Sequence, residues 1–407
     1  MDMRWTAIAA LIGCAAPLVA APAAQAAPRA PANCSPEQGA YSKAQLAQEP
    51  EPWWLETLNV KAAHEKATGR GVTVAVVDSG VNAANPQLAG QVLPAVDVTR
   101  TGAADCVGHG TEVAGLIAAK RGVTPFYGVA PDAKILPIKF AAQSTGVDSG
   151  LVAKAIDQAV AKHADVINIS TQSIGDDPRL RAAVKLALDR GIPVVAAAGN
   201  LDRKRGDVPE LMYPGGYPGV ITVGAVDRTG SITQFSNPKT PVTVIAPGKD
   251  IITTSADGHY IAKDGTSFAA PIVAGVVALI KQAYPDLTPG QIRARLERTA
   301  DGGKGAGSGS GMVNPYEAVT AVLPSGDGPA GGGTTGAGAG TPVQVIGPDK
   351  VDATARGIAF GIAGGGIGLA GVVVAVGLVL PLGRRRGWRP GRAVIADEAA
   401  AHESRFR

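Results

Sequence analysis

Residues 71 to 81 read GVTVAVVDSGV, and this stretch decides the fold. Within it, Val72 to Val77 form a continuous apolar run, which is typical of a strand buried on both faces of a parallel sheet. Asp78 ends the run, so a carboxylate is expected at the carboxyl end of the strand. Taken alone, an aspartate in this position more often caps a turn or the following helix.

The same apolar pattern recurs along the chain, with helical patterns between several of the runs. Further strands are predicted over Ile135 to Phe140, Val166 to Ile169, Ile192 to Ala197, Val220 to Val223 and Val242 to Ala246. Helices are predicted over His109 to Ala119, Leu151 to Lys162, Pro178 to Arg190, Ser267 to Tyr284 and Pro289 to Thr299. Because strands that alternate with helices form right-handed crossovers, the sequence predicts an α/β domain with a mainly parallel sheet and helices on both faces.

Three more polar side chains stand at strand ends or helix starts, where sites form on such sheets. His109 lies in VGHGTEVAGLIAA (107 to 119), ahead of an apolar helix. Ser267 opens the helix in GTSFAAPIVAGVVALI (265 to 280), and Asn200 follows the strand that ends at Ala197. Alone, this serine is an ordinary helix N-cap and this asparagine a common loop residue.

The combination of these side chains predicts acyl-transfer chemistry. A protease of this kind needs a nucleophile, a base, a group that orients the base, and donors for the oxyanion. Ser267, His109, Asp78 and Asn200 can fill these roles in that order, and all four belong to one predicted α/β domain. No His/Cys/Asp/Glu cluster has convincing metal-ligand spacing, so we expect no cofactor and no catalytic metal.

The motifs resemble those of the subtilases, and more closely those of the mycosins, the membrane-bound subtilisin-like proteases of type VII secretion systems. The resemblance covers residues 52 to about 322. It implies a subtilisin-like three-layer fold, Asp78, His109 and Ser267 as a catalytic triad, and Asn200 in the oxyanion hole. The segments that carry it are AVVDSGVN (75 to 82), DCVGHGTEVAGLIAA (105 to 119), YGVAPDAKILPIK (127 to 139), ADVINIS (164 to 170), AAAGN (196 to 200) and GTSFAAP (265 to 271).

The same resemblance suggests the substrate-binding residues. In subtilases the segment that matches Ser170, Thr171 and Gln172 pairs with the substrate as a strand. The segment that matches Ala197, Ala198 and Gly199 lines the first specificity pocket. Gln172 stands where many relatives have glycine, so the shape of this pocket is open at this point.

The N-terminus reads as an export signal. Arg4 precedes a short apolar run, and Ala24-Gln25-Ala26 matches the cleavage pattern, so residues 1–26 are predicted to be removed. Cys14 would leave with them, and Cys34 and Cys106 then form the single pair of cysteines. The alternative is two free thiols. By resemblance to mycosins, residues 27–56 would wrap the protease domain (57–322), held by a Cys34–Cys106 disulfide; the alternative is a propeptide that is cleaved and lost.

The C-terminal part predicts a membrane anchor. Residues 323–356 are rich in Gly, Pro and Thr, as in a flexible tether. Residues 357–382 contain an uncharged apolar segment long enough to span a bilayer, and five arginines follow it closely. The positive-inside rule places the tail, 383–407, in the cytoplasm and the protease domain outside the cytoplasmic membrane.

The formal net charge is +4, and the tail alone carries seven arginines against three acidic residues. The exported part therefore has no basic excess, and nucleic-acid binding is not expected. The sequence predicts a membrane-anchored serine endopeptidase that acts on exported proteins and is linked to type VII secretion. Two alternatives stay open: a structural subunit of a secretion membrane complex, and a free-standing membrane subtilase.

Overall fold

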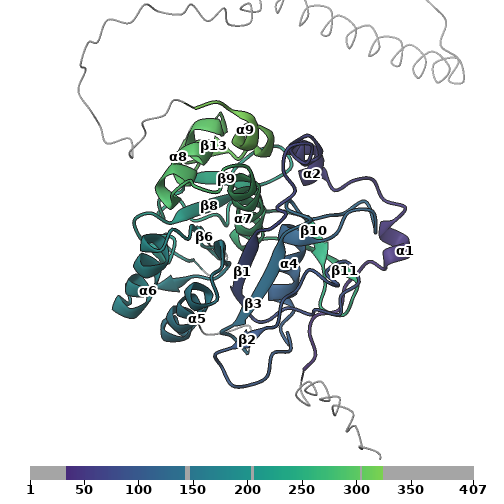
Figure 1. Cartoon of the computed structure of the whole chain (residues 1–407), viewed down its shortest axis with the longest axis horizontal. Coiled ribbons are helices and arrows are strands. Elements are labelled where there is room, and N and C mark those ends of the chain that lie inside the picture. The colour runs from purple at the N-terminus through teal and green to yellow at the C-terminus, as the bar shows by residue number, and fades with distance from the viewer. Residues whose placement is uncertain (1–33, 143–146, 203–205, 303–304, 324–407) are drawn as a thin grey trace, which may run out of the picture. The chain divides into compact units, whose positions relative to one another are not determined.

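The computed structural model describes residues 34–142, 147–202, 206–302 and 305–323. Its main sheet has the strand order β12-β13-β9-β8-β6-β4-β1-β3-β2 (Figure 1). All neighbouring strands pair in parallel except β12 and β13 at one edge. The strands are β1 (Thr73–Asp78), β2 (Val96–Asp97), β3 (Lys134–Lys139), β4 (Val166–Ile169), β6 (Val194–Ala197), β8 (Ile221–Val226), β9 (Val244–Pro247), β12 (Asp301–Gly302) and β13 (Gly311–Met312).

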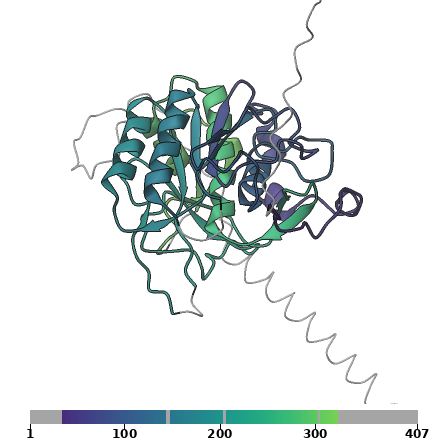
Figure 2. The same cartoon turned by 90° about the horizontal axis from the view of Figure 1, so that it is seen from below.

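The two faces of β1 show why its sequence is apolar throughout. Val74 and Val76 belong to the hydrophobic core that contains α4 (His109–Ala118) and α7 (Thr266–Ala283). Ala75 and Val77 belong to a second core with α5 (Ser149–Ala161) and α6 (Pro178–Asp189). Successive side chains of a strand point to opposite faces, so a strand covered on both sides needs no polar residue. Figure 2 shows α5 and α6 together on one side of the sheet.

Short polar signals begin several of the helices. Asp148 caps α5 by accepting hydrogen bonds from the backbone N–H groups of Gly150 and Leu151. Asp177 caps α6 in the same way, with Pro178 at the first helical position. Helix α8 (Pro289–Thr299) has a complete capping box between Thr288 and Gln291.

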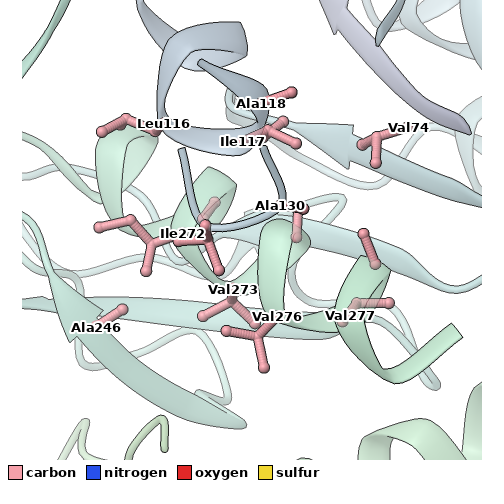
Figure 3. Close-up of a cluster of buried hydrophobic side chains, with 14 of the residues drawn as sticks. Val74, Leu116, Ile117, Ala118, Ala130, Ala246, Ile272, Val273, Val276 and Val277 are labelled. Carbon is pink, nitrogen blue, oxygen red and sulfur yellow. The ribbon is translucent and has the colours of Figure 1, made fainter. Parts of the chain in front are cut away.

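Helix α7 fills the centre of the first core. Figure 3 shows four of its side chains near Leu116 and Ile117 of α4, and these four are Ile272, Val273, Val276 and Val277. Within the described part of the chain, α7 is the one helix long and apolar enough to cross a membrane, but 78% of its apolar window is buried inside the protein. It is therefore a core helix. The membrane helix predicted at 357–382 lies outside the described residues.

The N-terminal extension packs into the protease domain. Short helices α1 (Lys43–Leu46), α2 (Trp53–Thr57) and α3 (Val60–Ala63) lead into the sheet. Trp54 and Leu55 of α2 are buried in the first core. The packing therefore continues across the predicted boundary between residues 56 and 57, because the apolar side chains of the extension use the core of the protease rather than one of their own.

A two-stranded hairpin receives the start of the described chain. Its strands are β10 (Ile251–Thr254) and β11 (Tyr260–Lys263). Tyr41 exchanges two backbone hydrogen bonds of 2.9 Å with Tyr260 of β11. A disulfide joins Cys34 to Cys106. The disulfide thus holds the extension next to the loop that leads into α4, and the Tyr41 hydrogen bonds hold it on the hairpin.

The predicted strands and helices are confirmed, with ends that shift by a few residues at most. One shift affects the site: α7 begins at Thr266 with Gly265 as its N-cap, so Ser267 is the second helical residue rather than the first. Sequence analysis gave no prediction for the hairpin β10–β11, for the pair β5 (Ser173–Ile174) and β7 (Met212–Tyr213), or for α9 (Pro315–Thr320).

Candidate active site

The structure brings Asp78 and His109 into direct contact. Both carboxylate oxygens of Asp78 lie 2.9 Å from Nδ1 of His109. The backbone N–H of Ser79 donates to the same carboxylate at 2.7 Å, and Asp78 is buried. Because a carboxylate accepts, Nδ1 carries the proton and Nε2 is the nitrogen that can accept one.

The loop before His109 is fixed by a second buried carboxylate, that of Asp105. Its oxygens accept hydrogen bonds from the N–H groups of Gly108 at 2.8 Å and Thr111 at 2.9 Å, and from the hydroxyls of Ser79 and Thr111. Glycine is required at position 110, since a Cβ there would lie 2.0 Å from the carbonyl oxygen of Gly80. Helix α4 therefore begins in close contact with the turn that follows β1.

Burial and charge act in opposite directions on His109. Burial lowers its pKa, but the charge and hydrogen bond of Asp78, with smaller effects from Glu112 and Asp105, raise the pKa to about 9. An aspartate that stabilises the charged imidazole in this way suits a base that becomes an imidazolium during acyl transfer.

Phe268, the residue that follows Ser267 in α7, contacts His109. The ring of Phe268 packs edge-on against the ring of His109, with centroids 5.5 Å apart. Ser170 Oγ donates to the carbonyl oxygen of Ser267 at 2.9 Å and accepts from the side-chain amide of Asn168 at 3.0 Å. No hydrogen bond reaches Ser267 Oγ from the described residues, and contacts of this kind often tighten only when substrate binds.

The amide of Asn200 has a defined orientation. Its Oδ1 accepts two hydrogen bonds of 2.9 Å from Thr266, one from the backbone N–H and one from the hydroxyl. The Nδ2 group is therefore left to donate, and a Cβ placed on Gly265 would lie 3.3 Å from it. Asn200 thus presents an N–H donor beside Gly265, which precedes Ser267 by two residues.

Gln172 is bound to the backbone of the same asparagine. Its Oε1 accepts from Asn200 N–H at 2.6 Å, and its Nε2 donates to the Asn200 carbonyl at 3.1 Å. A cavity of about 460 Å³ opens beside these two residues. It is lined by Val147, Ser149, Gln172, Ser173, Ile174, Asn200, Leu201, Asp207, Val208, Glu210 and Met212.

The predicted substrate residues thus divide into two groups. Thr171 and Gln172 are partly exposed beside the site, whereas the side chain of Ser170 is buried and holds the Ser267 peptide. Ala197, Ala198 and Gly199 are buried and do not line the cavity.

An ion network joins the extension to α4. Lys263 Nζ lies 2.5 Å from Glu37 and 3.6 Å from Glu112, a residue one turn after His109. Burial raises the pKa of Glu112 to about 7. Sequence analysis did not find Asp105, Ser79, Lys263 or Met212. Asp105 lies in one of the quoted motifs, but only the folded loop shows what its oxygens bind.

The chain belongs to the subtilase family, whose profile matches residues 69–321. It is a serine endopeptidase of the subtilisin type. It is 35% identical to subtilisin E of Bacillus subtilis (strain 168) over 271 residues, which cover 66% of this chain and 71% of that protein.

Among solved structures, mycosins are structural neighbours. MycP1 from the ESX-1 type VII secretion system has a TM-score of 0.63 and 29% identity, covering 74% of this chain and 93% of that one. MycP3 from the ESX-3 type VII secretion system has a TM-score of 0.60 and 31% identity, covering 72% and 99%. The similarity to mycosins expected from the motifs is confirmed.

Proposed function

We propose that this chain cleaves exported proteins from a membrane-anchored position, as part of or close to a type VII secretion system. One observation carries the catalytic part: His109 Nδ1 is bound by both carboxylate oxygens of Asp78, and its ring packs against Phe268, the residue after Ser267. In a subtilase, this arrangement supports Asp78, His109 and Ser267 as the triad and Asn200 as oxyanion donor.

The reaction follows from the positions of these groups. Nε2 of His109 takes the proton of Ser267 Oγ, which attacks the peptide carbonyl carbon. Nδ2 of Asn200 donates to the oxyanion that forms. The C–N bond then breaks, the amine leaves with the proton from His109, and the acyl group stays on Ser267. His109 next takes a proton from a water molecule that attacks the acyl carbon, the C–Oγ bond breaks, and the proton returns from His109 to Ser267 Oγ.

The anchoring part rests on the sequence, and the link to secretion rests on the solved relatives. We propose a removed signal (1–26), a retained extension (27–56), the protease domain (57–322), a tether (323–356), a membrane helix (357–382) and a cytoplasmic tail (383–407). The type VII secretion systems from which MycP1 and MycP3 come support the link to secretion. Cell fractionation of the full chain and of a chain truncated after residue 356 tests the anchor, which requires that only the full chain stays with membranes.

Fluorophosphonate labelling of the detergent-solubilised full chain tests the catalytic part. We expect the wild type to react at Ser267 and Ser267→Ala not to react. Ser173→Ala, the same change on β5, is the matched control and should still react. A folded wild type that does not label, or a Ser267→Ala variant that labels like the wild type, contradicts the proposal.

The same variant separates catalysis from a structural role in secretion. If proteolysis is the main role, export of secreted proteins fails both in cells that carry Ser267→Ala and in cells that lack the chain. If export fails only in cells that lack the chain, the protein acts there as a structural subunit, which is the second interpretation of the sequence.

A further inference from the structure

The space next to the α-carbon of Gly199 limits the size of the substrate side chain that the first specificity pocket can accept. Ala197, Ala198 and Gly199 are the residues expected to line this pocket, yet all three are buried and none of them lines the cavity beside Asn200. The cavity instead ends at Gln172 and Met212, which both line it. These two side chains therefore lie between the open cavity and the backbone of the expected pocket.

The contacts at Gly199 show how completely the space is filled. A Cβ placed on Gly199 would lie 2.9 Å from Met212 Cγ and 3.0 Å from Gln172 Oε1. The two side chains thus reach the α-carbon of Gly199 from two different segments. The missing side chain of Gly199 creates no further room, because atoms of Met212 and Gln172 already occupy that space.

Both side chains are held in place. The amide of Gln172 makes two hydrogen bonds to the backbone of Asn200. Met212 is only 5% exposed, and its backbone pairs with Ile174 in the strand pair β5–β7. Its N–H also donates to Thr240 Oγ1 at 3.2 Å. Moving the Gln172 side chain would break its two hydrogen bonds, and moving the Met212 side chain would disturb its buried packing. A large substrate side chain would have to offset these losses.

We propose that Gln172 and Met212 close the first specificity pocket, so that the enzyme cleaves after small residues such as glycine, alanine and serine. A small side chain at the cleaved bond fits without displacing either residue. A phenylalanine or leucine side chain would overlap atoms that already pack against Gly199. This specificity rests on the proposed function, because it assumes that substrate is attacked by Ser267 with the oxyanion at Asn200.

Two peptide p-nitroanilides that differ only in the residue before the scissile bond, alanine or phenylalanine, provide the test. The wild type is expected to prefer alanine in kcat/KM. The double variant Gln172→Gly with Met212→Ala opens the space, and we expect the ratio of alanine to phenylalanine to fall roughly 10- to 200-fold, the usual range for steric discrimination in an apolar pocket. Met212→Ala alone should lower the ratio by a smaller factor.

Controls separate this effect from loss of fold and from the open cavity. Met212→Leu keeps a side chain of similar size and should keep the preference for alanine. Val208→Ala widens only the outer rim of the cavity, so the ratio should stay at the wild-type value. Hydrolysis of the alanine substrate by each variant shows that it is folded.

The outcomes distinguish the two levels of the proposal. A wild type that labels with fluorophosphonate but cleaves after phenylalanine as well as after alanine overturns the closed pocket alone. A ratio that responds to Val208→Ala and not to the double variant also overturns it, since the side chain would then bind in the outer cavity. A folded wild type that neither labels nor cleaves overturns the proposed function and this specificity with it.

Discussion

The two sides of the site differ in how deeply their residues are buried: one is the side of His109, and the other is the side of the cavity beside Asn200. On the side of His109, buried groups of the core fix the loop, and the disulfide and Lys263 tie it to the extension. On the side of the cavity, the walls come from the two-residue strands β5 and β7 and the loops next to them. Ile174 and Val208 on these walls are 68% and 71% exposed. The groups that carry the chemistry are thus placed by the buried core, whereas the walls of the cavity are short strands and loops whose outer side chains are exposed.

The largest effect is expected from Asp78→Asn, which should impair catalysis at His109 and leave the substrate preference set beside the cavity unchanged. Loss of the aspartate that orients the base lowers kcat about 10⁴-fold, while the ratio of alanine to phenylalanine cleavage stays unchanged. Measurement of kcat/KM for both peptides checks this prediction. A variant with altered specificity would mean that the two sides are coupled.

The pH profiles of the wild type and of Asp78→Asn follow from the charge of His109. His109 must be neutral to accept a proton, and its pKa is raised to about 9, so wild-type kcat/KM should rise with pH up to that region. Asp78→Asn removes the main charge that raises this pKa, so the midpoint moves to lower pH. The free energy of unfolding depends on pH in the opposite direction. The stabilisation from the Asp78–His109 ion pair is complete below pH 6.5, the ordinary His pKa, and is lost as the pH rises through about 9.

The next smaller effect is expected from loss of the disulfide, which ties the extension to the loop before His109. Cys34 and Cys106 are 72 residues apart, and closing a loop of that length is worth about 4 kcal/mol in the chain-entropy model. The double variant Cys34→Ser with Cys106→Ser should unfold at lower urea concentration. Its folded form should still react with fluorophosphonate, since Tyr41 and Trp54 keep the extension in place. An unchanged urea midpoint would show that the bridge adds no stability.

The smallest of the three effects is expected from Asn200→Ala, at the boundary between the two sides. Loss of one oxyanion donor lowers kcat by roughly 10²- to 10³-fold, a range established on subtilisin itself. The KM should change little, because the donor acts on the charge that develops in the transition state. The ratio of alanine to phenylalanine cleavage should also hold, since Gln172 binds the backbone of residue 200 rather than its side chain. A rise in KM with unchanged kcat would assign Asn200 to substrate binding instead.

The sequence was sufficient for the elements whose pattern is set by local burial. Buried parallel strands are apolar on both faces, so the apolar runs of the parallel strands from β1 to β9 could be recognised without tertiary information. The hairpin β10–β11 could not, because Thr253 and Thr254 are fully buried polar residues whose hydroxyls bond to carbonyls of α4. The burial of Trp53 to Leu55 could not be predicted either, because the core that they join belongs to the protease domain.

The same distinction holds for the site. The triad candidates and Asn200 stand in motifs whose residues are close in sequence, so their roles could be predicted one motif at a time. Met212 is separated from Gly199 in the sequence by a loop. The pairing of β7 with β5 brings its side chain against Gly199. Lys263 meets Glu112 only because the hairpin packs on α4, so no pattern in the sequence links them.

The position of the two aromatic residues of α2 has a practical consequence. The sequence has four tryptophans, and Trp53 and Trp54 are the two in the described part of the chain. They stand side by side where the extension enters the core, and Trp54 is fully buried with its ring edge against Phe126. Within the described part of the chain, tryptophan fluorescence therefore comes from this junction alone. Its wavelength reports, without any attached dye, whether the extension is seated on the enzyme.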